Sequence, residues 1–209
     1  MIFSDIKSNT RKNLDDLSIT FYNSDDINDS IADAYNDIVT RTQCIIKKVS
    51  NLTWIANLSY IDFLNDYGIT DFMAVTAIFN HNTNLFLDDN LSLKQFNLIR
   101  EDWEINTGEP TNWAPHSFRR IAIFPKHVTS DGLFDLYYWA LAPAVDDASS
   151  PLVAPDKHMM FEQYGTADLL EQAEEFSKAM MFWEEYFSNI EQYMERVKTL
   201  AKSDLILLA

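Results

Sequence analysis

PDKHMMFEQYGTADLLEQAEEFSKAMMFWEEYFSNIEQYMERVKTLAKSD, residues 155–204, is the stretch that decides the expected fold. After Gly165 it contains neither glycine nor proline, the two residues that most often interrupt a helix. Apolar residues recur at every third or fourth position, and charged residues fall between them. We therefore predict one long amphipathic helix that begins near Thr166 and, at 1.5 Å per residue, runs for roughly 50 Å.

Two apolar rows follow this predicted helix. The first row is expected to lie in the core of a helical bundle, and its members are Met180, Trp183, Phe187, Ile190, Met194 and Val197. The second row makes the apolar stripe wider than the seam of a two-stranded coiled coil, so the helix should contact neighbours on two sides. Its large members, Phe176, Phe182, Tyr186, Tyr193 and Leu200, are candidate interface residues that face either another subunit or the same bundle.

Two shorter helices are predicted at the start of the chain. Residues 4–17 have one apolar helical face, and Ser4 is placed to cap its first turn. The second helix begins at Ser24, whose side chain can cap the helix before two aspartates at the positive end of the helix dipole. Its expected core residues are Ile27, Ile31, Tyr35 and Ile38, and it should end between residues 43 and 46.

The middle of the chain has the alternating pattern of strands. Residues 52–60 alternate in the manner of a half-buried strand, and residues 71–79 are apolar on both faces, as in an interior strand. Residues 118–124 and 133–140 predict two further strands. Between the strands predicted at 71–79 and 118–124, Ser92 and Gln95 have the spacing of a capping box and predict a short helix.

The order of these elements predicts the α+β class. Residues 1–46 and 155–209 should form an antiparallel helical bundle with one long C-terminal helix. Residues 47–154 should form an inserted small antiparallel β module that carries the short helix.

Composition narrows the range of functions. The formal net charge of −16 is spread along the chain, and such a surface repels the phosphate backbone of DNA or RNA. The longest strongly apolar run without a charge, residues 136–145, is half the length needed to span a bilayer, so we expect a soluble protein without a signal peptide. Cys44 is the single cysteine, which excludes a disulfide within the chain and fits a reducing compartment.

No catalytic motif is found in the sequence. The four glycines lie in no phosphate-binding pattern, and no GxSxG, HExxH or CxxC motif occurs. Neighbouring carboxylates are expected by chance in so acidic a chain, and the four histidines fall in loops or at the ends of elements. We expect no enzyme activity, no cofactor and no metal.

The last residues of the chain combine an exposed position with an apolar composition. Leu205, Ile206, Leu207 and Leu208 follow one another where chain ends are usually polar and mobile. We expect this segment to dock on a neighbouring molecule, with folding back onto its own bundle as the alternative.

The sequence resembles the head-to-tail adaptor, or connector, proteins of tailed bacteriophages, in particular those of short-tailed phages. The resemblance is carried by the following motifs: Asp26-Ile27-Asn28 with Ala34-Tyr35, AVTAIFN at 74–80 with Thr83-Asn84, LYYWALAP at 136–143, and TADLLEQAEEF at 166–176 followed by Trp183. These motifs occur in the same order over most of the chain. They are residues of packing type and include no catalytic signature.

The resemblance implies a structural virion protein that performs no chemistry. It implies a homo-oligomeric ring, commonly a dodecamer, that binds the phage portal protein and offers a docking surface to a tail protein of the nozzle or tail-tube. DNA would pass through the ring without specific binding, and the protein would enter the virion by assembly in the host cytoplasm.

Two other classes of function remain open on sequence grounds. A non-catalytic ligand-binding or other interaction module would need a concave apolar pocket with a few converging polar groups. An enzyme that acts through carboxylates would have a cleft in which an Asp or Glu has a strongly shifted pKa.

Overall fold

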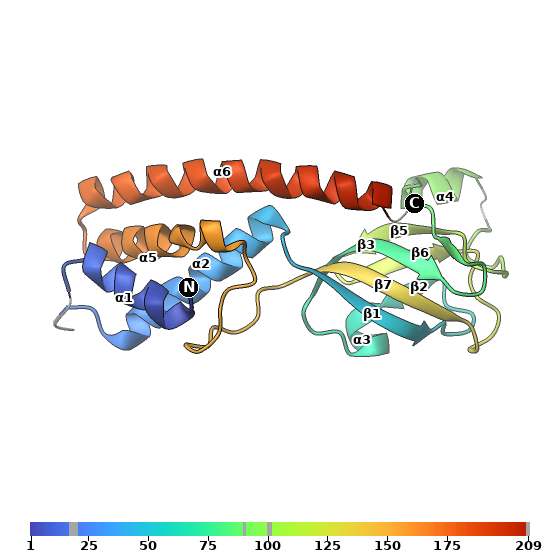
Figure 1. Cartoon of the computed structure of the whole chain (residues 1–209). Helices are drawn as coiled ribbons and strands as arrows, with labels where there is room; N and C mark the ends of the chain where they lie inside the picture. The colour runs from blue at the N-terminus through green and yellow to red at the C-terminus, as the bar shows by residue number, and fades with distance from the viewer. Residues whose placement is uncertain (17–20, 90, 100–101, 208–209) are drawn as a thin grey trace. The chain divides into compact units, whose positions relative to one another are not determined.

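The computed structural model describes residues 1–16, 21–89, 91–99 and 102–207, and for residues 99 and 201–207 it describes the backbone. The chain divides into two compact units (Figure 1). One unit is helical and comprises Met1–Ile45 and Leu141–Ala209, and the other, Ile46–Ala140, contains the strands. The predicted α+β class, with a long C-terminal helix and antiparallel sheets, is confirmed.

The segment 141–154 belongs to the helical unit, whereas the predicted boundary lay at residue 155. Backbone hydrogen bonding explains this difference. The Phe3 N–H donates to the Ser149 carbonyl over 2.9 Å, and the Leu152 N–H donates to the Tyr35 hydroxyl over 2.9 Å. These bonds tie the extended segment to the first two helices, although its two prolines, Pro143 and Pro151, indicated only a connection.

In its described residues the helical unit has four α-helices and one short 3-10 helix: α1 Phe3–Asn13, α2 Ser24–Thr42, η1 Pro155–Lys157, α5 Met159–Gln172 and α6 Phe176–Leu207. Aromatic rings lie where α1, α2 and α5 meet. The ring centroids of Phe3, Tyr35 and Phe161 are 5.5 to 5.9 Å from one another, and all three side chains are buried.

Helix α2 is capped one residue before the predicted cap. The Asn23 side-chain oxygen accepts hydrogen bonds from the backbone N–H groups of Asp25 and Asp26 at 2.7 and 2.9 Å. The Asp26 carboxylate accepts in return from the Asn23 N–H at 3.1 Å, which completes a capping box. The α1 cap also differs from the prediction, because the N-cap residue is Ile2 and Ser4 lies within the helix.

Gly165 lies inside α5, where three helices approach closely. A Cβ atom at this position would lie 2.9 Å from the Ile31 Cδ1 of α2 and 3.5 Å from the Thr10 Cγ2 of α1. The missing side chain therefore allows α5 to pack closely on α1 and α2. The predicted helix start near Thr166 was wrong, because α5 begins at Met159.

The predicted single long helix is divided into α5 and α6, which form a hairpin. At Glu174 the backbone has φ = 61°, in the left-handed region. The Glu174 and Glu175 N–H groups donate to the carbonyls of Glu171 and Leu170 at 3.0 and 2.9 Å, the pattern of a Schellman motif. Glycine or asparagine usually occupies this position, so a glutamate there gave no sign of a helix end.

The β unit contains two antiparallel sheets. The four-stranded sheet has the order β1-β7-β3-β4, and the three-stranded sheet has the order β2-β6-β5. The strands are β1 Ile46–Thr53, β2 Tyr60–Asp62, β3 Phe72–Asn80, β4 Leu85–Phe86, β5 Asn112–Ser117, β6 Arg120–Phe124 and β7 Leu133–Ala140. The strands predicted at 71–79, 118–124 and 133–140 are therefore confirmed to within two residues. The continuous strand predicted over 52–60 was wrong, because a loop separates β1 from β2.

Two short helices, α3 Phe63–Tyr67 and α4 Leu93–Ile99, complete the β unit. The predicted capping box of α4 is confirmed, since the Ser92 N–H donates to the Gln95 side-chain oxygen at 2.7 Å and the Gln95 N–H donates to the Ser92 hydroxyl at 3.3 Å. Trp54 is buried and stacks on Phe134 with a ring-centroid distance of 4.1 Å. A second cluster joins Phe96 and Trp103 to the three-stranded sheet.

Candidate interface on helix α6

The buried side of α6 runs between the two rows that the sequence suggested. Ala179, Tyr186, Ile190 and Tyr193 are at most 5% exposed, and their spacings of seven, four and three residues describe one helical stripe. Figure 1 shows α6 lying along α5, with α2 on the same side of it. The stripe packs against these two helices and takes members from both predicted rows.

Two candidate interface residues, Tyr186 and Tyr193, therefore lie in the subunit's own core. The Tyr186 hydroxyl donates a hydrogen bond to the Asp37 carboxylate of α2, and the Tyr193 hydroxyl accepts one from the Ala154 N–H at 3.3 Å. Burial, together with the bond to Asp37, raises the pKa of Tyr186, so this phenol stays protonated. Neither side chain is available to a partner.

Two residues assigned to the core are exposed instead. The exposed fraction is 59% for Met180 and 44% for Phe187. The physical reason is the position of the buried stripe, which leaves these residues at its edge. Four residues of α6 are half-buried: Trp183, Met194 and Val197, which were assigned to the core, and Phe182, which was assigned to the interface. Two other residues assigned to the interface, Phe176 and Leu200, are exposed. The α2 residues Ile27, Ile31, Tyr35 and Ile38, which the sequence assigned to the core, are all buried.

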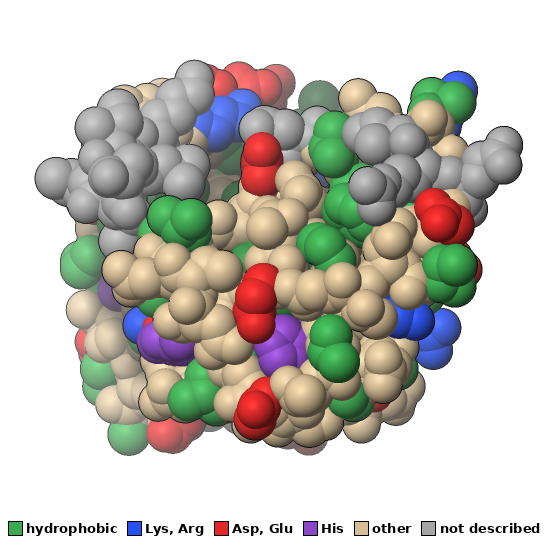
Figure 2. Space-filling model, turned by 90° about the vertical axis from the view of Figure 1, so that its right-hand side faces the viewer, with side chains coloured by type: hydrophobic (Ala, Val, Ile, Leu, Met, Phe, Trp, Pro, Cys, Tyr) green, Lys and Arg blue, Asp and Glu red, His purple; other side chains and the backbone are tan. Residues whose placement is uncertain are grey.

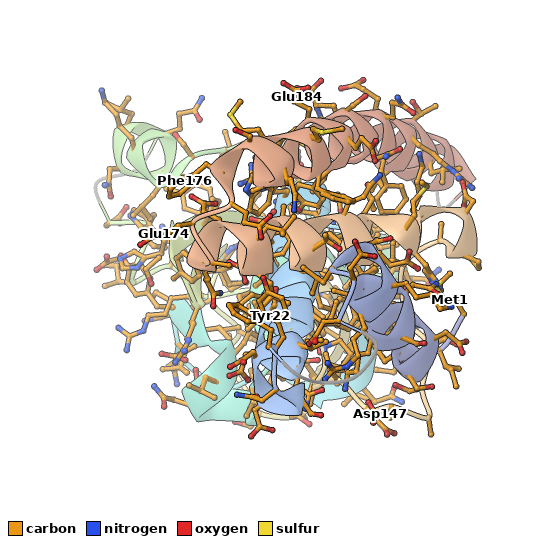
Figure 3. The ribbon with its side chains drawn as sticks, turned by 90° about the vertical axis from the view of Figure 1, so that its left-hand side faces the viewer. Met1, Tyr22, Asp147, Glu174, Phe176 and Glu184 are labelled. Carbon is orange, nitrogen blue, oxygen red and sulfur yellow. The ribbon has the colours of Figure 1, made fainter. Side chains whose placement is uncertain are left out.

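The exposed apolar residues of α6 line a surface groove of 440 Å³, which we call the α6 groove. Its lining residues are Glu171, Phe176, Ala179, Met180, Trp183 and Phe187. In Figure 3, Phe176 lies at the α5–α6 turn beside Glu174, and Glu184 points away from α5 on the outer side of α6. The groove thus occupies the first half of α6.

Aromatic contacts hold one wall of the α6 groove in place. Trp183 stacks on Phe187 with a centroid distance of 5.7 Å and contacts Tyr164 of α5 edge-on at 5.0 Å. The Trp183 Nε1 donates a hydrogen bond of 3.0 Å to the Glu171 carboxylate. Arg41 of α2 lies 5.8 Å from the centre of the Phe187 ring, in a cation–π contact. These contacts fix the two rings before any partner binds.

Helix α6 continues far beyond this groove. Leu205, Ile206 and Leu207 lie in its last turns, so the chain remains helical there and does not turn back along its own bundle. Leu208 lies outside the described residues. Leu200, one turn earlier, is 52% exposed.

One buried carboxylate with several partners lies outside α6, in the β unit. Asp135 of β7 is buried and accepts hydrogen bonds from the His81 ring at 2.8 Å and from the Asn51 N–H at 2.9 Å, and it pairs with Lys48 at 2.7 Å. Burial alone would raise its pKa, but the bonds from Lys48, His81 and Asn51 outweigh burial and lower the pKa of Asp135 to about 2. This arrangement ties β1 to β7 and to the turn after β3.

Neither a metal site nor a membrane helix is found in the described part of the chain. There, no three His, Cys, Asp or Glu residues come together as metal ligands would. Across the same residues, no helix is both long and apolar enough to cross a lipid bilayer. Figure 2 shows a face of the β unit on which hydrophobic side chains are separated by polar atoms and scattered carboxylates.

Comparison with known families identifies the class of protein. The model of the SU10 adaptor protein family matches residues 1–204. The chain belongs to this family, which makes it a structural adaptor of a bacteriophage and a component of the virion, with portal and tail proteins as its partners. The members of this family are structural phage proteins. No curated protein matches the sequence.

The sequence marked α6 as a candidate interface helix but gave no indication of the α6 groove. Ala179 and Glu171 were not predicted as site residues, and Met180 and Phe187 were assigned to the core. A signal was available, because Met180 and Met181 are adjacent and a single buried stripe cannot cover both.

Proposed function

We propose that this protein assembles into a closed ring of identical subunits, a dodecamer, that joins the portal to the tail and surrounds the DNA passage. The resemblance stated above suggested this assembly, and membership of the adaptor family supports it. The short-tailed type of phage and assembly in the host cytoplasm remain predictions of the same resemblance.

The exposed apolar surface of α6 is the observation that carries the proposal. Phe176, Met180 and Phe187, which line the α6 groove, are between 44% and 59% exposed within about three turns of one helix. A monomeric protein rarely leaves such a surface uncovered, and a covering subunit would bury it. In a ring, every subunit can cover its neighbour in the same way.

The charge of the chain supports the passage of DNA. With a net charge of −16, each subunit repels phosphates and releases few counterions on contact with DNA. A ring of such subunits presents no adhesive surface to a moving duplex. Duplex DNA can therefore pass through the ring without specific contacts to it.

The ligand-binding alternative is less well supported by the α6 groove. A small-molecule site holds its ligand through several converging polar groups. The groove contains one charged group, the Glu171 carboxylate, which already accepts a hydrogen bond from Trp183. Its shape and chemistry suit an apolar helix better than a small polar ligand.

Sedimentation with the portal protein tests the proposal. Purified protein mixed with assembled portal should sediment with it, and the mass added should correspond to a ring with one defined number of subunits. Free protein should remain soluble in the supernatant when the portal is omitted. If portal and protein sediment separately at micromolar concentrations, the proposed function is wrong.

A further inference from the structure

The final part of α6 runs past the helix that supports it. The 32 residues of α6 extend over about 48 Å and the 14 residues of α5 over about 21 Å, at 1.5 Å per residue. Because the two form a hairpin, α5 is level with the first half of α6: Gln163 of α5 bonds to Glu185 and Asn189 at 3.0 and 3.1 Å. Arg196 already pairs with Asp156, before the start of α5, at 2.8 Å. Residues 197–207 therefore continue beyond α5.

This extension has the pattern of a helix that packs on an apolar surface. Val197, Ala201 and Leu205 follow one another at spacings of four residues, which places these three positions on one face of α6. The backbone is helical to Leu207. An apolar stripe of this kind needs a complementary groove.

The α6 groove is such a surface, but it is out of reach of its own extension. Phe187 and Leu205 are 18 positions apart on one continuous helix, about 27 Å along its axis. A helix cannot bend back onto its own first half without breaking. Contact between the two therefore requires a second molecule.

Charge favours the same pairing. Residues 171–187, which contain the groove, include five acidic residues and one lysine. Residues 197–208 include two lysines and one aspartate in a chain whose net charge is −16. Glu174 and Glu184 form no ion pair with any residue that the structure describes. Lys198 pairs with Glu195 of its own helix at 3.1 Å, but both side chains are exposed and such a pair is weak, so it does not prevent contact with these carboxylates.

We propose that the α6 groove of one subunit binds residues 197–208 of a second copy of this chain. The contact joins two different surfaces, so each subunit gives its extension to one neighbour and receives the extension of the other, which is the head-to-tail type of contact from which rings are built. The inference rests on the proposed ring, for which it supplies the contact between subunits.

Photo-crosslinking within assembled rings identifies the occupant of the groove. A photoreactive phenylalanine analogue is placed at position 180, and this protein is mixed with a ¹⁵N-labelled copy and with portal. Mass spectrometry should map the cross-links to residues 197–208 of the other copy. The matched control is the same analogue at Met181, which is 66% exposed but does not line the groove, and it should give at least tenfold fewer links to that segment.

The outcomes separate this inference from the proposed function. In one outcome, rings form on the portal while position 180 cross-links to the portal, to another surface of the copy, or to nothing. That result would overturn the inference but leave the proposed ring function standing. Absence of any ring, seen by electron microscopy, would overturn both.

Charge substitutions give a second, independent measurement. Met180→Asp and Leu205→Asp should each reduce assembly on the portal at least tenfold, and Met181→Asp should change it by less than twofold. Met180→Asp should keep the melting temperature of the wild-type subunit, because the side chain is exposed. If Met180→Asp assembles as well as Met181→Asp, the groove is not the docking surface.

Discussion

At the scale of single residues, adjacent positions of α6 hold one side chain that is buried in the subunit and one that is exposed to a partner. Tyr186 is fully buried and donates a hydrogen bond to Asp37, whereas Phe187 is 44% exposed and lines the α6 groove. The first supports the fold of the subunit, and the second is available to a partner. Substitutions at such neighbouring positions should therefore separate stability from assembly.

Truncation of Tyr186 should destabilise the subunit strongly. Tyr186→Ala leaves a cavity among Tyr164, Trp183 and α2 and should lower the free energy of unfolding by about 3 to 5 kcal/mol. Met180→Ala removes an exposed side chain and should change it by less than about 0.5 kcal/mol. Urea denaturation of the isolated subunit measures both values. Equal effects of the two substitutions would contradict the assignment of Tyr186 to the buried side of α6 and of Met180 to its exposed side.

Asp135 should make the β unit sensitive to acid. Its folded-state pKa of about 2 lies below the ordinary value of 3.8, so its contribution to stability is fully present above pH 4 and is lost as the pH falls from 4 to 2. The contribution at neutral pH is about 2 kcal/mol. Asp135→Asn should flatten the fall in stability between pH 4 and 2, measured by denaturation at each pH. The exposed control Asp29→Asn should retain the wild-type slope, and an unchanged slope in Asp135→Asn would contradict the assignment.

At the scale of elements, the packing of α5 depends on the absence of a side chain at Gly165. Gly165→Leu would push against Ile31, Thr10 and Ser30 and should lower the free energy of unfolding by about 1 to 3 kcal/mol. Thermal denaturation checks this expectation, with Ala173→Leu as a control beyond the end of α5, where the side chain is half-buried. A Gly165→Leu subunit as stable as the wild type would mean that the three helices are further apart.

The elements also show what could be predicted from the sequence and what could not. Strands β3 and β7 are long and apolar, so their pattern was clear, whereas β5 was missed because NWAPHS has no alternation and contains Pro115. That proline is tolerated because β5 lies at the edge of its sheet. The turn at Glu174 could not be predicted, because its left-handed conformation is fixed by α5–α6 packing and not by a residue that prefers it.

The site was predictable only in part for a related reason. Helix α2 has a single apolar stripe, so its core residues could be predicted from the sequence. The sequence also marked α6 as apolar on two sides. On α6 the apolar stripe is wider than the area that α2 and α5 cover. Which of its residues remain exposed is decided by the position of these helices, a property of tertiary structure.

At the scale of the whole molecule, charge determines behaviour toward DNA. The net charge of −16 should prevent binding of duplex DNA at physiological salt, because no counterions are released when acidic side chains approach phosphates. A gel-shift titration with the assembled protein and a duplex of random sequence measures this, and a basic DNA-binding protein is the positive control. Tight binding that weakens with added salt would contradict the proposed passive passage.

Electron microscopy of the portal mixed with this protein tests the ring most directly. The account predicts an added ring of density under the portal, with one subunit of this protein at each repeat and with α6 at the contact between neighbours. Portal particles without added density, at protein concentrations far above that of the portal, would contradict the account.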